Sequence, residues 1–273
     1  GAVQRAAESV RVNVWLTDRE SGRQLWAERY ERPFRDVLVV QEEIISHILQ
    51  VLPVQITAAE RQRLSRRYTR NLEAYDYFLR AKAAFLMREP AENQAAQRMY
   101  RKAIELDPRF AQAYAWNACV IGQAMVRGYK DNPKELKARA VEAIHRAVAP
   151  DADDVECHRL MCEITMGGRQ FDQAMVHNER ALRLNPNDPR IVAQKGELLI
   201  WLGKPGEGEE WLKKASKLDP HGDHTRSHLL GRALFGLRRY AEALEAFKQV
   251  GTLRYDHHAA IAACYAQLGQ DAE

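Results

Sequence analysis

The chain has 273 residues, of which 46% are hydrophobic and 29% are charged, so it can bury the core of one long domain or of two smaller ones. It contains no uninterrupted run of about 18 apolar residues, which is the length that a membrane-spanning helix needs. The formal net charge of +4 is modest for this length and gives no case for nucleic-acid binding by itself.

The cysteines favour one cellular compartment, and the start of the chain raises a separate expectation about the native protein. Four cysteines are scattered through segments of helical periodicity: Cys119, Cys157, Cys162 and Cys264. Such scattering favours reduced thiols over a disulfide framework, so we expect a cytoplasmic location. The sequence opens at Gly1 without a basic and then apolar leader, and we expect the native chain to begin further upstream.

The first predicted element is a β-hairpin. Apolar and polar residues alternate from Val10 to Leu16 and again from Gln24 to Tyr30, which is the pattern of half-buried strands. Between them, Asp18 to Arg23 (DRESGR) supplies turn residues. Residues 2–5 are a candidate third strand.

Two helices are predicted after the hairpin. Apolar residues recur at helical spacing from Val40 to Val51, with Asp36 as a cap and Pro53 as the end. A capping box at Thr57 to Glu60 predicts a second helix through about residue 67. Because these elements make a poor core alone, residues 1–70 are predicted to be either the remnant of an α/β domain or an interdomain connector.

Beyond residue 70 a proline-terminated pattern recurs in the sequence. It reads RKAIELDPRF, then ERALRLNPND, then KKASKLDPHG, with prolines at Pro108, Pro186 and Pro220. The last two prolines lie 34 residues apart and the first two 78 apart, about twice a slightly longer unit. A further copy with an early Pro150, HRAVAPDADD, lies between them. The repeat unit is therefore about 34 to 39 residues long.

Each unit contains two apolar blocks of helical spacing separated by a short turn, which predicts an antiparallel helix pair. Small residues recur where the paired helices must approach closely. In the first helices they are Ala81, Ala118, Cys162, Gly196 and Gly231, and in the second helices Ala96, Ala140, Ala174, Gly208 and Ala243. An Asp-Pro or Asn-Pro step then ends the second helix, because proline disfavours a helical conformation in the residue before it.

This pattern resembles the tetratricopeptide repeat family. The matching positions are Tyr100, Ala103 and Pro108, then Ala174, Ala181 and Pro186, then Gly196, Gly203, Ala215 and Pro220, and finally Gly231, Tyr240, Ala243 and Phe247. The resemblance implies a mainly α fold, a right-handed solenoid of helical hairpins over residues 71–273, with about five helical pairs and one half repeat. The first unit departs from the pattern by about three extra residues, which we place in its turn. The final half is either a cap or a truncation.

The segment before the repeats carries a second resemblance. VRVNVWLTDRESGRQLWAERYER, followed by Asp36 and VQEEI, is similar to a segment between effector domains and tetratricopeptide repeats in bacterial signalling proteins. These include class III adenylate or guanylate cyclases and winged-helix transcriptional regulators. The resemblance covers about residues 1–70 and implies an upstream catalytic or DNA-binding domain. No residue here matches the paired metal-binding aspartates of the cyclases.

The candidate chemical motifs favour structural roles. Cys157, His158 and Cys162 lack a four-ligand spacing, Asp151 to Asp154 lacks the glycine of a calcium loop, and Gly203 to Gly208 lacks the phosphate-loop order. A histidine-rich region could bind zinc or nickel opportunistically through His221, His224, His228, His257 and His258. We therefore predict no catalytic residue, no cofactor and no evolved metal site.

The remaining candidate is the concave groove of the solenoid, lined by the first helices. Aligning the repeats on the small residue of each first helix indicates which side chains of that helix face the groove. The predicted binding residues are Phe78, Lys82, Phe85, Gln112, Arg159, Glu163, Arg190, Glu197, Trp201, His228, Arg232 and Phe235. Arginine with aromatic residues suits a protein or peptide partner, although the phenylalanines could instead pack against neighbouring helices. A lysine and asparagine clamp for a terminal carboxylate is not evident.

These features predict a non-catalytic interaction scaffold, the regulatory or sensory carboxy-terminal region of a bacterial signalling protein. The alternative is the regulatory part of a nucleotide cyclase whose catalytic domain lies outside this chain. Self-association through the repeats or the hairpin edge is a further expectation, whereas a membrane is not expected. The arginine-rich run from Arg61 to Arg70 favours a solvated or interdomain helix, then an acidic partner surface, over nucleic acid.

Overall fold

The computed structural model describes residues 1–6, 8–18, 21–51, 68–129, 133–148, 154–220, 225–250 and 255–269. The first elements are β1 (Ala2–Ala6), β2 (Ser9–Thr17), β3 (Gln24–Pro33), the 3-10 helix η1 (Phe34–Asp36) and α1 (Val37–Val51). Strand β1 confirms the candidate third strand. The helix predicted over residues 57–67 and most of the arginine-rich run lie outside the described residues.

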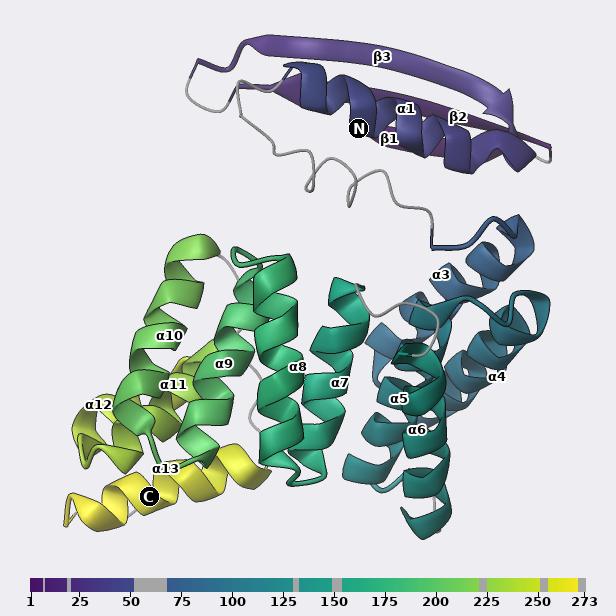
Figure 1. Cartoon of the computed structure of the whole chain (residues 1–273). Coiled ribbons are helices and arrows are strands. Elements are labelled where there is room, and N and C mark those ends of the chain that lie inside the picture. Colours follow the sequence, from purple (N-terminus) through teal and green to yellow (C-terminus); the bar gives the residue numbers. More distant parts are fainter. Residues whose placement is uncertain are drawn as a thin grey trace.

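The three strands form an antiparallel sheet in the order β1-β2-β3, and α1 contacts β2 and β3 (Figure 1). The predicted alternation is confirmed, because Val10 and Val12 of β2 are buried with Tyr30 of β3 and Val40 of α1. The Tyr30 hydroxyl also lies 2.8 Å from Nδ1 of His47. Burial, together with the nearby carboxylate of a glutamate on β3, raises the pKa of Tyr30 to about 12. The hydroxyl donates to Glu28 of β3 at 2.9 Å and also contacts His47 of α1, so it lies where the helix meets the sheet.

The rest of the described chain is a row of antiparallel helix pairs followed by one more helix (Figure 1). The pairs are α3 (Leu72–Met87) with α4 (Pro90–Leu106), α5 (Ala111–Val126) with α6 (Pro133–Val148), α7 (Val155–Gly167) with α8 (Phe171–Leu184), α9 (Pro189–Trp201) with α10 (Pro205–Leu218), and α11 (Thr225–Gly236) with α12 (Tyr240–Lys248); α13 (Tyr255–Gln267) follows. Each first helix contacts its own second helix and the next first helix. This confirms the predicted mainly helical fold.

The Asp-Pro and Asn-Pro steps end helices as predicted. Asp107, Asn185 and Asp219 cap α4, α8 and α10, and their φ angles are −142°, −145° and −141°. Each extended cap residue still donates its backbone N–H to the carbonyl four residues earlier. Since the same cap recurs in three units, the chain leaves α4, α8 and α10 in the same backbone conformation.

The small residues predicted at the helix crossings are buried. Ala81, Ala118, Cys162, Ala96, Ala174 and Ala243 are each 0% exposed, and Ala140 is 4% exposed. Gly196 and Gly208 face each other across α9 and α10, since a Cβ on Gly208 would lie 2.9 Å from the Gly196 carbonyl oxygen. The periodicity therefore located the close contacts between paired helices correctly.

The extra residues of the first unit lie in its helices, so their predicted place in the turn is wrong. Helices α3 and α4 have 16 and 17 residues, whereas α9 and α10 have 13 and 14. The turn between α3 and α4 is only Arg88 and Glu89. Pro90 fits the first helical position, where its missing N–H would have no helical partner, so α4 begins directly after this short turn.

Three turns within pairs place an arginine where the other two have a glycine, Gly128 or Gly203. Arg88, Arg169 and Arg238 have φ angles of 58°, 59° and 60°, and Gly203 has a φ of 76°. In this left-handed region a side chain costs roughly 1–2 kcal/mol, which glycine avoids.

We expect Arg238→Gly to raise the free energy of unfolding by about 0.5–1 kcal/mol, because the relief of strain exceeds the added backbone entropy of the unfolded chain. Chemical denaturation followed by circular dichroism measures this. Arg239→Gly is the matched control: Arg239 has a φ of −90° and an ion pair at 2.9 Å with Glu209, so its replacement destabilises the fold. Equal losses in both variants would contradict the strain at Arg238.

Candidate functional site

Trp116 of α5 lies between two cations from neighbouring first helices. The Lys82 Nζ atom of α3 lies 4.7 Å from the Trp116 ring centroid, and the Arg159 Cζ atom of α7 lies 5.8 Å from it. Trp116 is 9% exposed, so these cation–π contacts form where solvent is largely excluded, which strengthens them. The contacts join three successive first helices.

A cluster of charges continues this arrangement to α9. Glu156 accepts from Arg159 at 2.9 Å and from Arg190 at 3.3 Å, and Arg190 also pairs with Asp188 at 2.7 Å. The side chains of Glu156 and Arg159 are only 16% and 12% exposed, whereas Arg190 is 58% exposed. Arg190 is therefore the member of the cluster that a partner could reach.

The pKa shifts reflect this crowding of charge. Burial disfavours ionised Glu156, but the hydrogen bond and charge of Arg159, with Arg190 and Lys82, hold the pKa of Glu156 below its usual value. Burial lowers the pKa of Lys82; Glu156 opposes this shift, and the positive charges of Arg190 and Arg159 add to it. Glu156 thus holds three cations together.

A second cluster lies on α9 and α11. The Arg232 Cζ atom is 4.2 Å from the Trp201 ring centroid, and Trp201 is 47% exposed. Burial raises the pKa of Glu197, an effect that the positive charge of Arg232 partly opposes. Phe171 stacks on Trp201 with ring centroids 6.1 Å apart. The indole is held by its neighbours yet remains open to a ligand.

The two clusters define what we term the first-helix row. Its members are Lys82, Trp116, Glu156, Arg159, Arg190, Glu197, Trp201 and Arg232.

Comparison with curated proteins finds partial relatives, although no family model matches the sequence. The chain is 31% identical over 174 residues to a protein named putative adenylate cyclase 3 of Rhizobium meliloti (strain 1021), covering 64% of this chain and 30% of that protein. It is 31% identical over 101 residues to small glutamine-rich tetratricopeptide repeat-containing protein 2 of Mycosarcoma maydis, covering 36% of this chain and 28% of that protein. The matches span less than a third of either relative.

Solved structures match the fold more fully. TTC0263, a tetratricopeptide repeat protein of Thermus thermophilus, gives a TM-score of 0.56 at 18% identity, covering 71% of this chain and 99% of that chain. The chain has the fold of a tetratricopeptide repeat array. The pilus biogenesis factor PilW gives a TM-score of 0.58 at 17% identity, covering 72% of this chain and 86% of that chain. These identities establish the fold alone.

Several residues predicted to line the groove of the tetratricopeptide repeat array serve its packing. Phe78 and Gln112 are only 4% and 8% exposed, and Gln112 donates to Asp154, the N-cap of α7, at 3.1 Å. Phe85 packs edge-on against Trp116. Two further predicted residues pack on aromatic neighbours: Phe235 on Tyr240, and His228 on Phe247 and His257. Glu163 is half-exposed and pairs with Arg159 at 3.3 Å.

Sequence phasing missed two members of the first-helix row in the tetratricopeptide repeat array. Trp116 lies four residues after Gln112, and Glu156 lies three residues before Arg159. Residues three or four apart share a helix face, so extending the predicted set by one turn would have included both.

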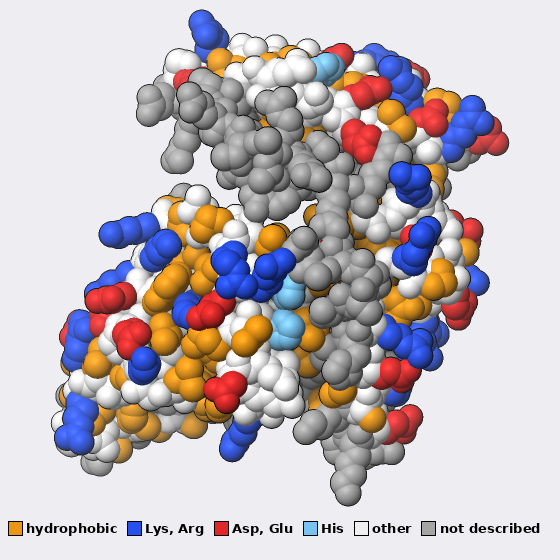
Figure 2. All heavy atoms as spheres, in the orientation of Figure 1, with side chains coloured by type: hydrophobic (Ala, Val, Ile, Leu, Met, Phe, Trp, Pro, Cys, Tyr) orange, Lys and Arg blue, Asp and Glu red, His pale blue; other side chains and the backbone are white. Residues whose placement is uncertain are grey.

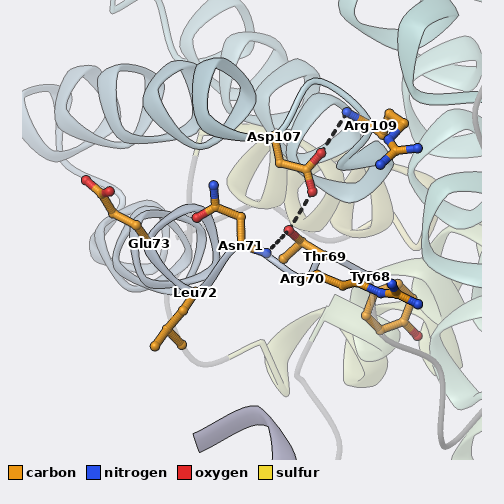
Figure 3. Close-up of a pocket in the computed structure, with 8 residues that line it drawn as sticks. All are labelled: Tyr68, Thr69, Arg70, Asn71, Leu72, Glu73, Asp107 and Arg109. Carbon is orange, nitrogen blue, oxygen red and sulfur yellow. Dashed lines mark hydrogen bonds between the residues drawn. The ribbon is translucent and has the colours of Figure 1, made fainter. Parts of the chain in front are cut away.

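A surface hollow opens at the beginning of α3 and the end of α4, lined by residues 68–73 with Asp107 and Arg109 (Figure 3). The Thr69 hydroxyl donates to Asp107 at 2.6 Å and accepts from the Asn71 backbone N–H at 3.0 Å, and both bonds are drawn as dashed lines in Figure 3. The Asn71 side chain caps α3 by accepting from Ala74, and Asp107 accepts from the Arg109 N–H, both at 3.0 Å. These polar groups stabilise the beginning of α3 and the end of α4, so we assign the hollow a structural role.

The cysteines have the environment of packed residues in the tetratricopeptide repeat array. All four are buried and outside any disulfide, and burial raises the pKa of Cys162 to about 12, which keeps it a thiol at neutral pH. Nearby, Nδ1 of His158 lies 3.0 Å from Nδ1 of His177. The calcium-loop candidates Asp151 and Asp153, with His221 and His224, lie outside the described residues. Of the helices that are described, none has the length and apolar character to cross a membrane.

Proposed function

We propose that the tetratricopeptide repeat array binds a protein or peptide segment through the first-helix row, as the non-catalytic regulatory region of a bacterial signalling protein. The observation that carries the proposal is the row itself, in which one cluster of charged and aromatic side chains joins α3, α5, α7 and α9 and a second cluster joins α9 and α11. Tryptophan and arginine contribute strongly to protein interfaces. Contacts already made within the row hold both residue types in place, which reduces the entropy lost on binding.

The row favours a partner of mixed polarity. Arg190 is 58% exposed and offers donors to carboxylate or carbonyl oxygens, and the half-exposed Trp201 offers an apolar face. Glu163, which is also half-exposed, can accept from a cationic side chain. On the face drawn in Figure 2, hydrophobic, basic and acidic side chains are interspersed. Nucleic acid would instead favour a continuous basic patch.

A second candidate is the regulatory part of a nucleotide cyclase. It rests on the similarity to putative adenylate cyclase 3, which covers 64% of this chain and 30% of that protein. The first 70 residues resemble the segment before the repeats in such cyclases. In this role the repeats would act on a catalytic domain of the same protein. Sequencing the gene upstream of Gly1 distinguishes the candidates, because a class III cyclase domain there supports the second and its absence rejects it.

Affinity capture with paired baits tests whether the first-helix row binds a protein partner. The chain and an Arg190→Gln, Arg232→Gln variant serve as baits in lysate of the source organism, with mass spectrometry of retained proteins. Lys102→Gln, Arg146→Gln is the matched control, since it removes two positive charges from exposed, ion-paired residues of second helices. We expect the chain and the control to retain the same partner. The row variant should retain about tenfold less of it, because substitutions at hot-spot residues cost over about 1.4 kcal/mol of binding free energy. Equal retention by all three baits rejects the groove.

A further inference from the structure

Two histidines and an aspartate meet where the last helix pair contacts α13. His228 belongs to α11, and Asp256 and His257 lie in the first turn of α13. Their potential ligand atoms all lie within 4.8 Å of one another. The imidazole rings of His228 and His257 have centroids 4.5 Å apart. The fold therefore brings together three metal-ligating side chains from two repeats.

We infer that His228, Asp256 and His257 form a binding site for a divalent transition-metal ion, with zinc as the best fit. Two imidazole nitrogens and one carboxylate oxygen are ligands that zinc accepts, at about 2.0–2.2 Å in tetrahedral sites, and they leave a fourth position for water or another ligand. Tetrahedral ligand atoms at that bond length lie about 3.4 Å apart, so small side-chain rotations bring these groups into range. Calcium and magnesium prefer all-oxygen ligand sets.

The surroundings of the cluster suit a metal site. His257 is 8% exposed, and the His228 ring lies 5.5 Å from the ring of Phe247, which is 1% exposed. An apolar shell limits solvent access and strengthens coordination. Among the residues that the structure describes, this is the one group of three histidine, cysteine or acidic side chains whose potential ligand atoms lie close enough together to hold a metal ion.

The position of the site implies a structural effect. The α13 helix packs on the core of the last pair through Cys264, Ile261 and Tyr265. An ion held by His228 and His257 would add a bond between the beginnings of α11 and α13. Because the ligands come from segments far apart in sequence, they are close together only in the folded chain, so ion binding stabilises the fold. None of the three ligands belongs to the first-helix row, so metal binding does not depend on partner binding.

Calorimetric titration of the chelator-treated chain with zinc chloride tests the site. We expect one zinc per chain, and binding weaker by at least about 100-fold in His257→Ala, since even loss of a group that only orients a ligand costs about 10- to 100-fold. His258→Ala is the matched control, because His258 is the next residue, is exposed and lies outside the cluster. It should bind zinc like the unaltered chain.

A second pair of measurements separates coordination from folding. Asp256→Asn keeps the shape of the side chain but removes its charge, and we expect it to weaken zinc binding while the circular-dichroism spectrum is unchanged. Cobalt(II) in place of zinc should give the intense visible absorption of a tetrahedral site in the chain and in His258→Ala, but not in His257→Ala. Absence of zinc binding by the chain, or unchanged binding by His257→Ala and Asp256→Asn, would overturn the site.

Discussion

Replacing Gly208 with alanine is expected to lower the free energy of unfolding by about 2–3 kcal/mol, the range of overpacked cores. The added Cβ would lie 2.8 Å from Cγ1 of Ile200 and 2.9 Å from the carbonyl oxygen of Gly196. The second contact is with backbone, so α9 and α10 must move apart to relieve it. That movement would also loosen the buried contacts of Leu212 with neighbouring helices.

Gly122→Ala is the matched control for this prediction. Gly122 lies inside α5, and a Cβ there would meet nothing within 4 Å. Alanine should therefore stabilise that helix by about 0.5–1 kcal/mol through its higher helix propensity. Thermal and urea unfolding of both variants, followed by circular dichroism, measure the difference. A stabilising effect of Gly208→Ala would contradict the close approach of α9 and α10.

The repeat fold was predictable because its determinants are local. The Asp-Pro and Asn-Pro steps act through the conformation of one residue, and the caps at Asp107, Asn185 and Asp219 share one geometry. Small residues at a fixed offset mark helix crossings, since a larger side chain fits none of them. The predicted ranges 1–70 and 71–273 remain a prediction about domains.

The candidate site was only partly predictable, because its contacts join separate helices. Periodicity identifies the face of a helix but not which of its side chains the neighbouring segments cover: Phe78 packs on Tyr100 and Phe110 and is buried, whereas Trp201 is half-exposed. The packing of successive first helices also sets Lys82 and Arg159 against Trp116. His228 was predicted for the groove, but the placement of α13 sets it against His257. Such pairings depend on interhelical distances that a single sequence does not supply.

Replacing Glu156 with glutamine is expected to lower the free energy of unfolding by about 2–3 kcal/mol at neutral pH. Removing one partner of a buried ion pair costs about 3–5 kcal/mol. Here the loss is smaller because Glu163 still pairs with Arg159 at 3.3 Å and some solvent reaches the cluster. Glu163→Gln is the matched control. It changes the same chemical group on a half-exposed partner of Arg159 and should cost less than about 0.5 kcal/mol.

The difference in stability between the chain and Glu156→Gln should also depend on pH. The pKa of Glu156 lies below its usual 4.5, so its ionised form stabilises the fold above that value, and this contribution is lost as the pH falls through the lower folded-state pKa. The facing charges of Lys82, Arg159 and Arg190 stay positive throughout this range. The stability gap between the chain and Glu156→Gln should therefore narrow on acidification below about pH 4.5. Urea unfolding across that range measures the gap, and a constant gap would mean that Glu156 acts through packing and not through its charge.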